Sequence, residues 1–378
     1  MTHPLPFDPS RRRWLQAGAG ALAGTALLSR LASARAQATA ATASAAAPLR
    51  LDLNESSYGP SPRVAEAIRA AVAQAPRYVE EAQAQALRAQ IAAFESVAPE
   101  QVVLGEVLEA LGQHLAIAHG GGRFVYSTPG YGALVDAAAP FGGKAVEVPL
   151  DAKLENDLPA LAAAVDADTR AVFVVNPHNP SGTVSAPAAF DAFVREVSRR
   201  TLLIVDEAYL DYLDDFRERT AVRHLREGAN IVVFRTFGKI HALAGLQIGY
   251  AVAPRALADA LHARGVGGAH AQNQLSIAAA SASLADTAHV AAVRRQVAAE
   301  RVRWLHFLDG LKRPYAQPAG NFVFFDSGRP HARFAEALKA QGVRIGRAFP
   351  PYADWARITI GTSEENARAQ RAIAAVLA

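Results

Sequence analysis

Four side chains with complementary chemistry each lie just past a short apolar segment: Asn179, Asp206, Tyr209 and Lys239. A lysine amine can form an imine with an aldehyde and can afterwards carry a proton. A buried carboxylate favours the protonated form of a nearby pyridine nitrogen, which makes the ring a better electron sink. A phenol and an amide can hydrogen-bond an oxygen on the same ring. The set therefore favours chemistry on a pyridine aldehyde such as pyridoxal.

Each of these residues also has an ordinary structural explanation. Lys239 could be a surface lysine, Asp206 a helix cap, and Asn179 with Pro180 a turn. Lysine is rare here, however, because only five of the 39 basic residues are lysines. The order of the residues, each after an apolar segment, argues against three independent coincidences.

The apolar segments themselves predict strands. Residues 171–175, 202–205 and 231–234 are nearly uninterrupted runs that are apolar on both faces, as in parallel strands covered by helices on both sides. Residues 187–199, between two of them, have helical spacing. Ligands of such sheets bind beyond the carboxyl ends of the strands. The expected fold class is therefore α/β, a mostly parallel sheet flanked by helices with a smaller α+β domain.

Five segments are expected along the chain. They are a signal peptide (1–36), a linker (37–48), an N-terminal arm and helix (49–82), a large cofactor-binding domain (83–264) and a small C-terminal domain (265–378). The small domain would begin with a long helical region and continue with two strands that enclose a further helix.

The N-terminal segment resembles a twin-arginine export signal. Residues 10–15 read Ser-Arg-Arg-Arg-Trp-Leu, an apolar run follows at 17–28, and Ala-Arg-Ala at 34–36 is typical of a cleavage site. The expected location is the periplasm, with no membrane attachment after cleavage. An uncleaved anchor and a cytoplasmic protein are the alternatives.

Composition excludes several classes of function. Residues 1–36 hold five arginines and one acidic residue, which accounts for the formal net charge of +4. The charge therefore does not indicate nucleic-acid binding. The absence of cysteine excludes disulfides and thiolate chemistry. No metal-ligand spacing occurs, so no metal site is predicted.

Taken together, the motifs resemble fold-type-I aminotransferases of the aspartate aminotransferase superfamily, and within it histidinol-phosphate aminotransferases. The similarity covers about residues 50–375. It rests on residues 53–62, the pair Arg77-Tyr78, and residues 179–182, 205–209, 236–250, 320–322 and 357–362.

The resemblance implies that pyridoxal 5'-phosphate is the cofactor and that Lys239 carries it as a Schiff base. It also implies a set of further cofactor contacts: Asp206 with the pyridine nitrogen, Tyr209 and Asn179 with the 3-oxygen, Tyr131 stacked on the ring, and Thr236 at the phosphate.

Three further roles follow from the same resemblance. Tyr78 would reach the phosphate of the neighbouring subunit's cofactor, which implies a homodimer with shared sites. Arg357 would hold the substrate α-carboxylate, a task for a planar bidentate donor. Asn54 would also contact the substrate.

The phosphate site departs from the family pattern at three places. The usual glycine-rich turn is replaced by residues 104–109, where Leu108 crowds the turn and Glu106 adds negative charge. Gly238 stands in place of a serine, and Gln247 in place of an arginine. A hydrogen bond to a charged group contributes about 1.5–3 kcal/mol, so losing the arginine could weaken binding about ten- to a hundredfold. Either the cofactor binds less tightly, or the protein is a degenerate relative.

The expected reaction is transamination between an amino acid, with histidinol phosphate or a related amine as a candidate, and a 2-oxo acid. A decarboxylase or lyase on the same scaffold is one alternative, and a degenerate exported binding protein is another. Arg344 or Arg347 could meet a second anionic group on the substrate, although either could equally be a solvated surface arginine.

Overall fold

The structure, a computed structural model, describes residues 47–378. The predicted signal peptide (1–36) and most of the predicted linker (37–48) lie outside the described residues. Within the described part of the chain, no helix is long and apolar enough to cross a membrane.

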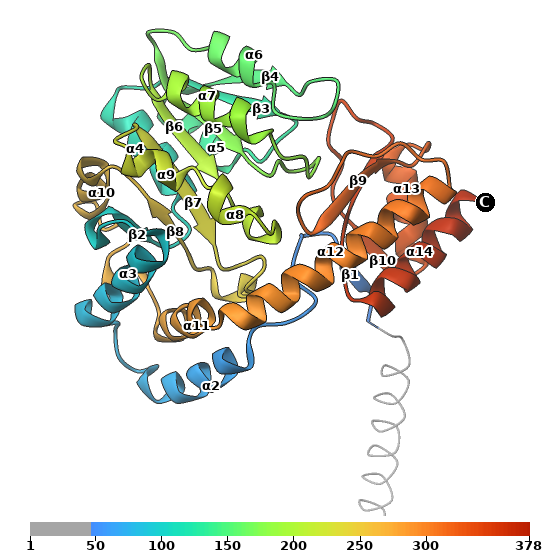
Figure 1. Cartoon of the computed structure of the whole chain (residues 1–378), viewed down its shortest axis with the longest axis horizontal. Coiled ribbons are helices and arrows are strands. Elements are labelled where there is room, and N and C mark those ends of the chain that lie inside the picture. Colours follow the sequence, from blue (N-terminus) through green and yellow to red (C-terminus); the bar gives the residue numbers. More distant parts are fainter. Residues whose placement is uncertain (1–46) are drawn as a thin grey trace, which may run out of the picture. The chain divides into compact units, whose positions relative to one another are not determined.

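A seven-stranded sheet lies at the centre of the larger core (Figure 1). Its strands follow the order β2 (Val102–Leu104), β8 (Gly249–Val252), β7 (Ile231–Thr236), β6 (Leu202–Asp206), β5 (Thr169–Val175), β3 (Gly122–Thr128) and β4 (Gly143–Pro149). Only β8 runs antiparallel to its neighbours, and the other pairs are parallel. The predicted mostly parallel sheet is confirmed, and the three predicted strands lie within β5, β6 and β7.

Alternation along β5 shows why this sheet needs helices on both faces. Val172 and Val174 belong to one apolar cluster, whereas Ala171, Phe173 and Val175 belong to the opposite one. Successive strand residues point to opposite faces, so a strand that is apolar throughout must be covered twice. Helices α3 (Glu81–Glu95), α6 (Leu158–Ala163), α7 (Pro187–Val197) and α11 (Gln274–Ala285) contribute to the first cluster, and α4 (Leu108–Ala118), α5 (Ala133–Ala138) and α10 (Arg255–His262) to the second.

Shorter elements complete this part of the chain. They are the helices α2 (Pro62–Ala71), α8 (Phe216–Arg219) and α9 (Val222–Arg226), and the 3-10 helices η1 (Val72–Gln74), η2 (Pro99–Gln101), η3 (Ala139–Phe141), η4 (Leu210–Tyr212), η5 (Ala244–Leu246) and η6 (Ala269–Ala271).

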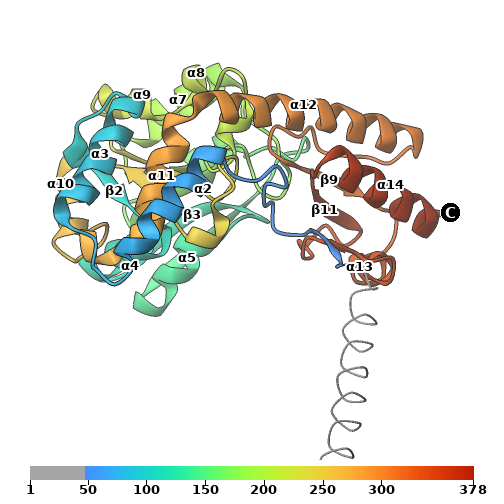
Figure 2. The same cartoon turned by 90° about the horizontal axis from the view of Figure 1, so that it is seen from below.

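A second apolar core contains two small sheets and three helices. Strand β9 (Phe322–Asp326) pairs antiparallel with β11 (Trp355–Thr359), and β1 (Leu49–Leu51) pairs parallel with β10 (Val343–Ile345). The helices are α12 (Thr287–Gly310), α13 (His331–Ala340) and α14 (Ser363–Leu377). Figures 1 and 2 show α12 and α14 side by side.

The expected long helical region is divided into α11 and α12 by Asp286. The Asp286 side chain accepts a hydrogen bond from the backbone N–H of His289 and so caps α12. Helix α11 packs with the first core, against α2 and α3 (Figure 2), and α12 with the second. The predicted domain boundaries stay predictions, but the chain passes from one core to the other at this break.

Strand β1 fixes the position of the segment that follows it. Because β1 is paired with β10, the chain beyond Leu51 is held at a defined position. Asn54 then donates its backbone N–H to the Thr359 hydroxyl at 2.9 Å, and Asn321 donates to the Asn54 carbonyl at 3.2 Å. These contacts attach Asn54 to the end of β11 and to the residue just before β9.

Candidate active site

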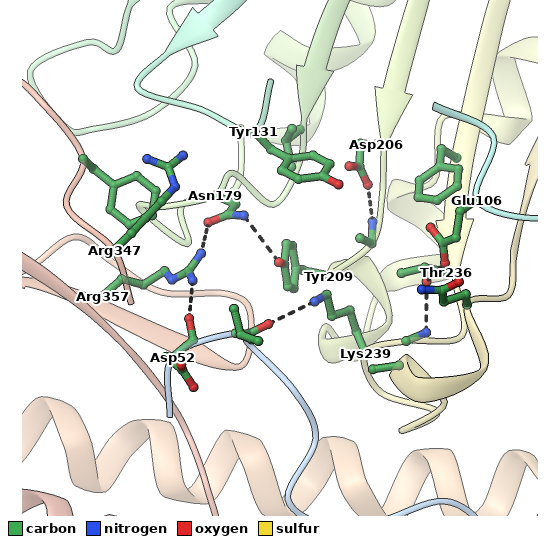
Figure 3. Close-up of a pocket in the computed structure, with 18 of the residues that line it drawn as sticks. Asp52, Glu106, Tyr131, Asn179, Asp206, Tyr209, Thr236, Lys239, Arg347 and Arg357 are labelled. Carbon is green, nitrogen blue, oxygen red and sulfur yellow. Dashed lines mark hydrogen bonds between the residues drawn. The ribbon is translucent and has the colours of Figure 1, made fainter. Parts of the chain in front are cut away.

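A pocket of about 640 Å³ lies at the carboxyl ends of the parallel strands (Figure 3). Its walls come from the ends of β5, β6 and β7, from the segment after β1, and from the second core. All but two of the predicted site residues line it: Tyr131, Asn179, Asp206, Tyr209, Thr236, Lys239 and Arg357. Asn54 does not line the pocket but hydrogen-bonds to Tyr209, which does. Tyr78 also does not line the pocket.

Asp206 is the last residue of β6, and its neighbours β5 and β7 bury it on both sides. Its side chain is 3% exposed. One carboxylate oxygen accepts the backbone N–H of Ala208 at 2.9 Å. Burial raises the pKa of Asp206 to about 7, against the opposing effects of this hydrogen bond and of Lys239. A positive partner would lower that pKa again.

Lys239 follows β7 after a two-residue turn and is half-buried in the pocket. Its Nζ donates to the backbone carbonyl of Leu53 at 3.2 Å and lies 5.7 Å from the centre of the Tyr209 ring. The amine is thus held toward the pocket by a neutral acceptor (Figure 3).

The Tyr209 hydroxyl accepts hydrogen bonds from two side-chain amides. Asn54 Nδ2 donates to it at 3.1 Å and Asn179 Nδ2 at 3.5 Å. The other end of the Asn179 amide, Oδ1, accepts from Arg357 Nη1 at 2.6 Å. Residues separated by more than a hundred positions therefore form one hydrogen-bonded chain across the pocket (Figure 3).

Arg357, on β11, is a buried cation whose hydrogen-bond acceptors are neutral. Besides Asn179, it donates from Nη2 to the backbone carbonyl of Asp52 at 2.7 Å. Among the residues that the structure describes, it has no carboxylate partner. A buried charge without a counter-ion is costly, so this position is well matched to a ligand that brings an anionic group.

The two predicted tyrosines take different positions. Tyr131 lines the pocket and is 42% exposed. Tyr78 does not line it and is 83% exposed, with its ring 5.5 Å from that of His270. Tyr78 is therefore not brought to the pocket of its own chain.

A carboxylate lies beside Thr236 at the end of the pocket near α4. The Thr236 hydroxyl donates to Glu106 Oε1 at 2.9 Å and accepts the backbone N–H of Gly238 at 2.9 Å. A β-carbon on Gly238 would lie 3.2 Å from the Thr236 hydroxyl oxygen, so a larger residue would crowd this contact. Gln247 lines the same end.

Sequence reasoning did not list Glu106, Asp52 or Arg347 as site residues, although all three line the pocket. The sequence indicated the charge of Glu106 and offered Arg347 as one of two candidates for a second anionic group, but it did not indicate Asp52. Of the two arginines considered for a second anion, Arg344 forms an ion pair with Asp52 at 2.7 Å, whereas Arg347 lines the pocket. The Arg347 guanidinium lies 4.3 Å from the centre of the Phe349 ring.

Comparisons with known proteins agree with this geometry. Residues 47–373 match the family model described as aminotransferase class I and II. The chain is 34% identical over 339 residues to a histidinol-phosphate aminotransferase of Moorella thermoacetica, covering 87% of this chain and 86% of that one. It is 36% identical over 321 residues to an aromatic amino acid aminotransferase of Rhodococcus jostii, covering 84% and 87%.

A solved structure shows the same fold. The histidinol-phosphate aminotransferase of Sinorhizobium meliloti, crystallised in complex with pyridoxal-5'-phosphate, superposes with a TM-score of 0.77 at 28% identity, covering 88% of this chain and 91% of that one. The chain belongs to the class I and II aminotransferases.

Proposed function

We propose that this pocket carries out pyridoxal-phosphate-dependent transamination between an anionic amino acid or amine and a 2-oxo acid. One observation carries the proposal: Lys239, Asp206 and Arg357 line a single pocket, with the first two at the ends of adjacent strands. The family match supports the transamination itself. The identity of the substrate and the roles of individual residues are our inference.

The residues fit the ring and the aldehyde of pyridoxal phosphate. Asp206 is a buried carboxylate whose pKa is raised to about 7, and a protonated ring nitrogen would supply the missing positive partner. Lys239 presents its amine to the same pocket, and the Tyr209 hydroxyl and Asn179 amide lie within it. At the phosphate end the fit is partial, because the Thr236 hydroxyl is present but already donates to Glu106.

When bound, pyridoxal phosphate supplies an aldehyde for the substrate amine and a ring that accepts electrons from the substrate's α-carbon. Lys239 would hold the cofactor, and its Nζ would take the proton from the substrate's α-carbon and deliver it to the carbon that carried the aldehyde. Asp206 would keep the ring nitrogen protonated. Tyr209 and Asn179 would orient the ring through its oxygen, and Arg357 would orient the substrate through its carboxylate.

Two arginines at one side of the pocket favour a substrate with more than one anionic group. Arg357 is buried, and Arg347 lines the same pocket beside Phe349. A phosphate or a side-chain carboxylate could meet Arg347 while the other group meets Arg357. The relative from Moorella thermoacetica is named for histidinol phosphate, which makes that amine the first compound to test.

Absorbance of the purified protein tests the proposal directly. Adding a reactive amino acid or amine should convert the bound aldehyde form to the amine form, and a 2-oxo acid should reverse the change. Release of carbon dioxide in place of reversal would indicate a decarboxylase. A protein that stays colourless with excess cofactor would contradict any activity of this kind.

We also propose export from the cytoplasm, supported by the twin-arginine-like segment at residues 10–15 and the Ala-Arg-Ala at 34–36. The twin-arginine route carries folded proteins, so the cofactor could bind before export. N-terminal sequencing of the native protein should find a start near Gln37 or Thr39. An intact Met1 in a cytoplasmic fraction would contradict the proposal.

A further inference from the structure

The end of the pocket near α4 contains a carboxylate where a cofactor phosphate would have to bind. Glu106 immediately precedes the residue that caps α4, and its Oε1 accepts the Thr236 hydroxyl at 2.9 Å. Three other residues line the same end. Thr236 offers a hydroxyl, Gly238 has no side chain, and Gln247 offers a neutral amide. None of these three side chains carries a positive charge that could balance both Glu106 and a phosphate.

The groups that face Glu106 make its negative charge unfavourable. Glu109 lies in the first turn of α4, and Asp206 lies at the end of β6. The Tyr131 hydroxyl also faces this end, but burial raises its pKa and it stays neutral. Lys239 is the cation of this set, and the proposed function engages its amine with the cofactor. Glu106 keeps part of its surface in contact with solvent. Partial desolvation in the pocket and the charge of Glu109 nevertheless raise its pKa, against the opposing effects of Thr236 and Lys239.

If Glu106 were neutral, it could stay beside the cofactor phosphate without repelling it and without any rearrangement of the pocket. Its carbonyl oxygen could keep accepting the Thr236 hydroxyl, while its O–H would donate to a phosphate oxygen. An ionised Glu106 can only accept hydrogen bonds, so it would face the phosphate as a second anion.

We propose that Glu106 is the residue that sets the charge preference of the cofactor site: it takes up one proton from solvent when pyridoxal phosphate binds, stays neutral, and donates a hydrogen bond to the phosphate. The inference rests on the proposed function, because it assumes that this pocket binds the cofactor. It implies that the phosphorylated aldehyde loses its advantage over the unphosphorylated one as the pH rises.

The test compares two ligands on the apo protein: pyridoxal phosphate and pyridoxal, which share the ring and the aldehyde. The ratio of their dissociation constants isolates the phosphate end, since effects at Lys239 and Asp206 cancel. Measurements between about pH 6 and about pH 8 should show the preference for pyridoxal phosphate falling in the wild type. The phosphate itself ionises near pH 6, but this affects every variant alike.

Two substitutions distinguish the hydrogen bonds made by Glu106 from the effect of negative charge near the phosphate. Glu106→Gln keeps the acceptor for Thr236 and adds a permanent donor, so the preference for pyridoxal phosphate at about pH 8 should rise about tenfold or more and depend less on pH. Glu109→Gln removes a neighbouring charge that makes no hydrogen bond to Thr236, and should change the preference much less. Thermal unfolding checks that both variants are folded.

Calorimetry provides a second readout that needs no substitution. The binding enthalpy measured in buffers of different ionisation enthalpy should report about one more proton taken up with pyridoxal phosphate than with pyridoxal, as the proposal requires. Equal uptake, or the same ligand preference in Glu106→Gln and wild type, would overturn the inference. If neither ligand binds any variant, the proposed function fails first and the inference falls with it.

Discussion

Lys239 is set apart from the other four lysines by its surroundings. It follows a buried strand, and its Nζ donates to the Leu53 carbonyl inside the pocket. Borohydride reduction of the holoenzyme followed by peptide mapping should place the pyridoxyl adduct on Lys239. Lys239→Ala should give no adduct under the same conditions. An adduct on any other lysine of the wild type would show that the attachment site is wrong.

Gln247 offers a second test of the phosphate end. Its backbone is already left-handed, with φ of 48°, so exchanging one long side chain for another should add little strain. Gln247→Arg should tighten pyridoxal-phosphate binding by about 1–3 kcal/mol if the guanidinium reaches the phosphate. Part of the gain would come from neutralising Glu106.

Titration of apo protein with cofactor measures this change, and Gln247→Met controls for loss of the amide alone. Weaker or unchanged binding in Gln247→Arg would mean that the phosphate is held by another group, such as a basic residue of a partner subunit. The added charge would then only crowd the site.

Residues at strand ends could be predicted from sequence, whereas contacts across the pocket could not. Asn179, Asp206 and Lys239 each follow a recognisable apolar strand. Glu106 meets Thr236 across 130 positions, because β2 joins the sheet beside β8 and not beside its neighbours in sequence. No local pattern carries that information. Which of Arg344 and Arg347 is available to a second anionic group likewise depends on Asp52. This residue follows β1 and forms an ion pair with Arg344.

At the scale of elements, a buried ion cluster joins β7 to three neighbours. Arg235 contacts Glu207 at 3.0 Å, Asp211 at 2.9 Å and Glu95 at 3.6 Å. These acids follow β6, lie in η4 and end α3. The Tyr250 hydroxyl donates to Glu95 at 2.6 Å. The cluster thus fixes the strand that leads to Lys239 against the elements around it.

Arg235→Met should destabilise the fold by about 3–5 kcal/mol, because it leaves buried carboxylates without their cation. Without the arginine their folded-state pKa values would rise, so the folded variant would bind protons more tightly than the unfolded chain. The loss should therefore be smaller at about pH 5 than at about pH 8. Denaturant unfolding measures it. As a control, Arg255→Met removes an exposed arginine that pairs with Asp259, and it should change stability by about 1 kcal/mol or less. A loss that does not depend on pH would contradict this explanation.

The parallel strands were predictable because burial on both faces leaves a continuous apolar run. The direction of β8 was not, since residues 248–252 would be equally apolar in either orientation. The break between α11 and α12 was also missed. Asp286 lies in an otherwise helical pattern, and its capping role depends on the two helices packing in different cores.

At the scale of the whole molecule, the position of Tyr78 bears on assembly. It is 83% exposed and lies outside the pocket of its own chain, although the family resemblance assigns it to a cofactor phosphate. A homodimer in which each Tyr78 completes the partner's site would reconcile the two facts. Light scattering should therefore give twice the mass of the mature chain, and a monomer at working concentration would contradict the shared site.

A hybrid dimer tests the sharing itself. Tyr78→Phe should weaken cofactor binding in its own homodimer, by about 1.5–3 kcal/mol for the loss of a hydrogen bond to a charged group. In a hybrid of Lys239→Ala and Tyr78→Phe subunits, the only site with a lysine lies on the Tyr78→Phe subunit. If Tyr78 acts across the interface, that site receives an intact tyrosine from its partner and should bind the cofactor like the wild type. If Tyr78 serves its own chain, the hybrid should bind as weakly as the Tyr78→Phe homodimer. Tyr315→Phe, which does not line the pocket, should leave binding unchanged in either combination.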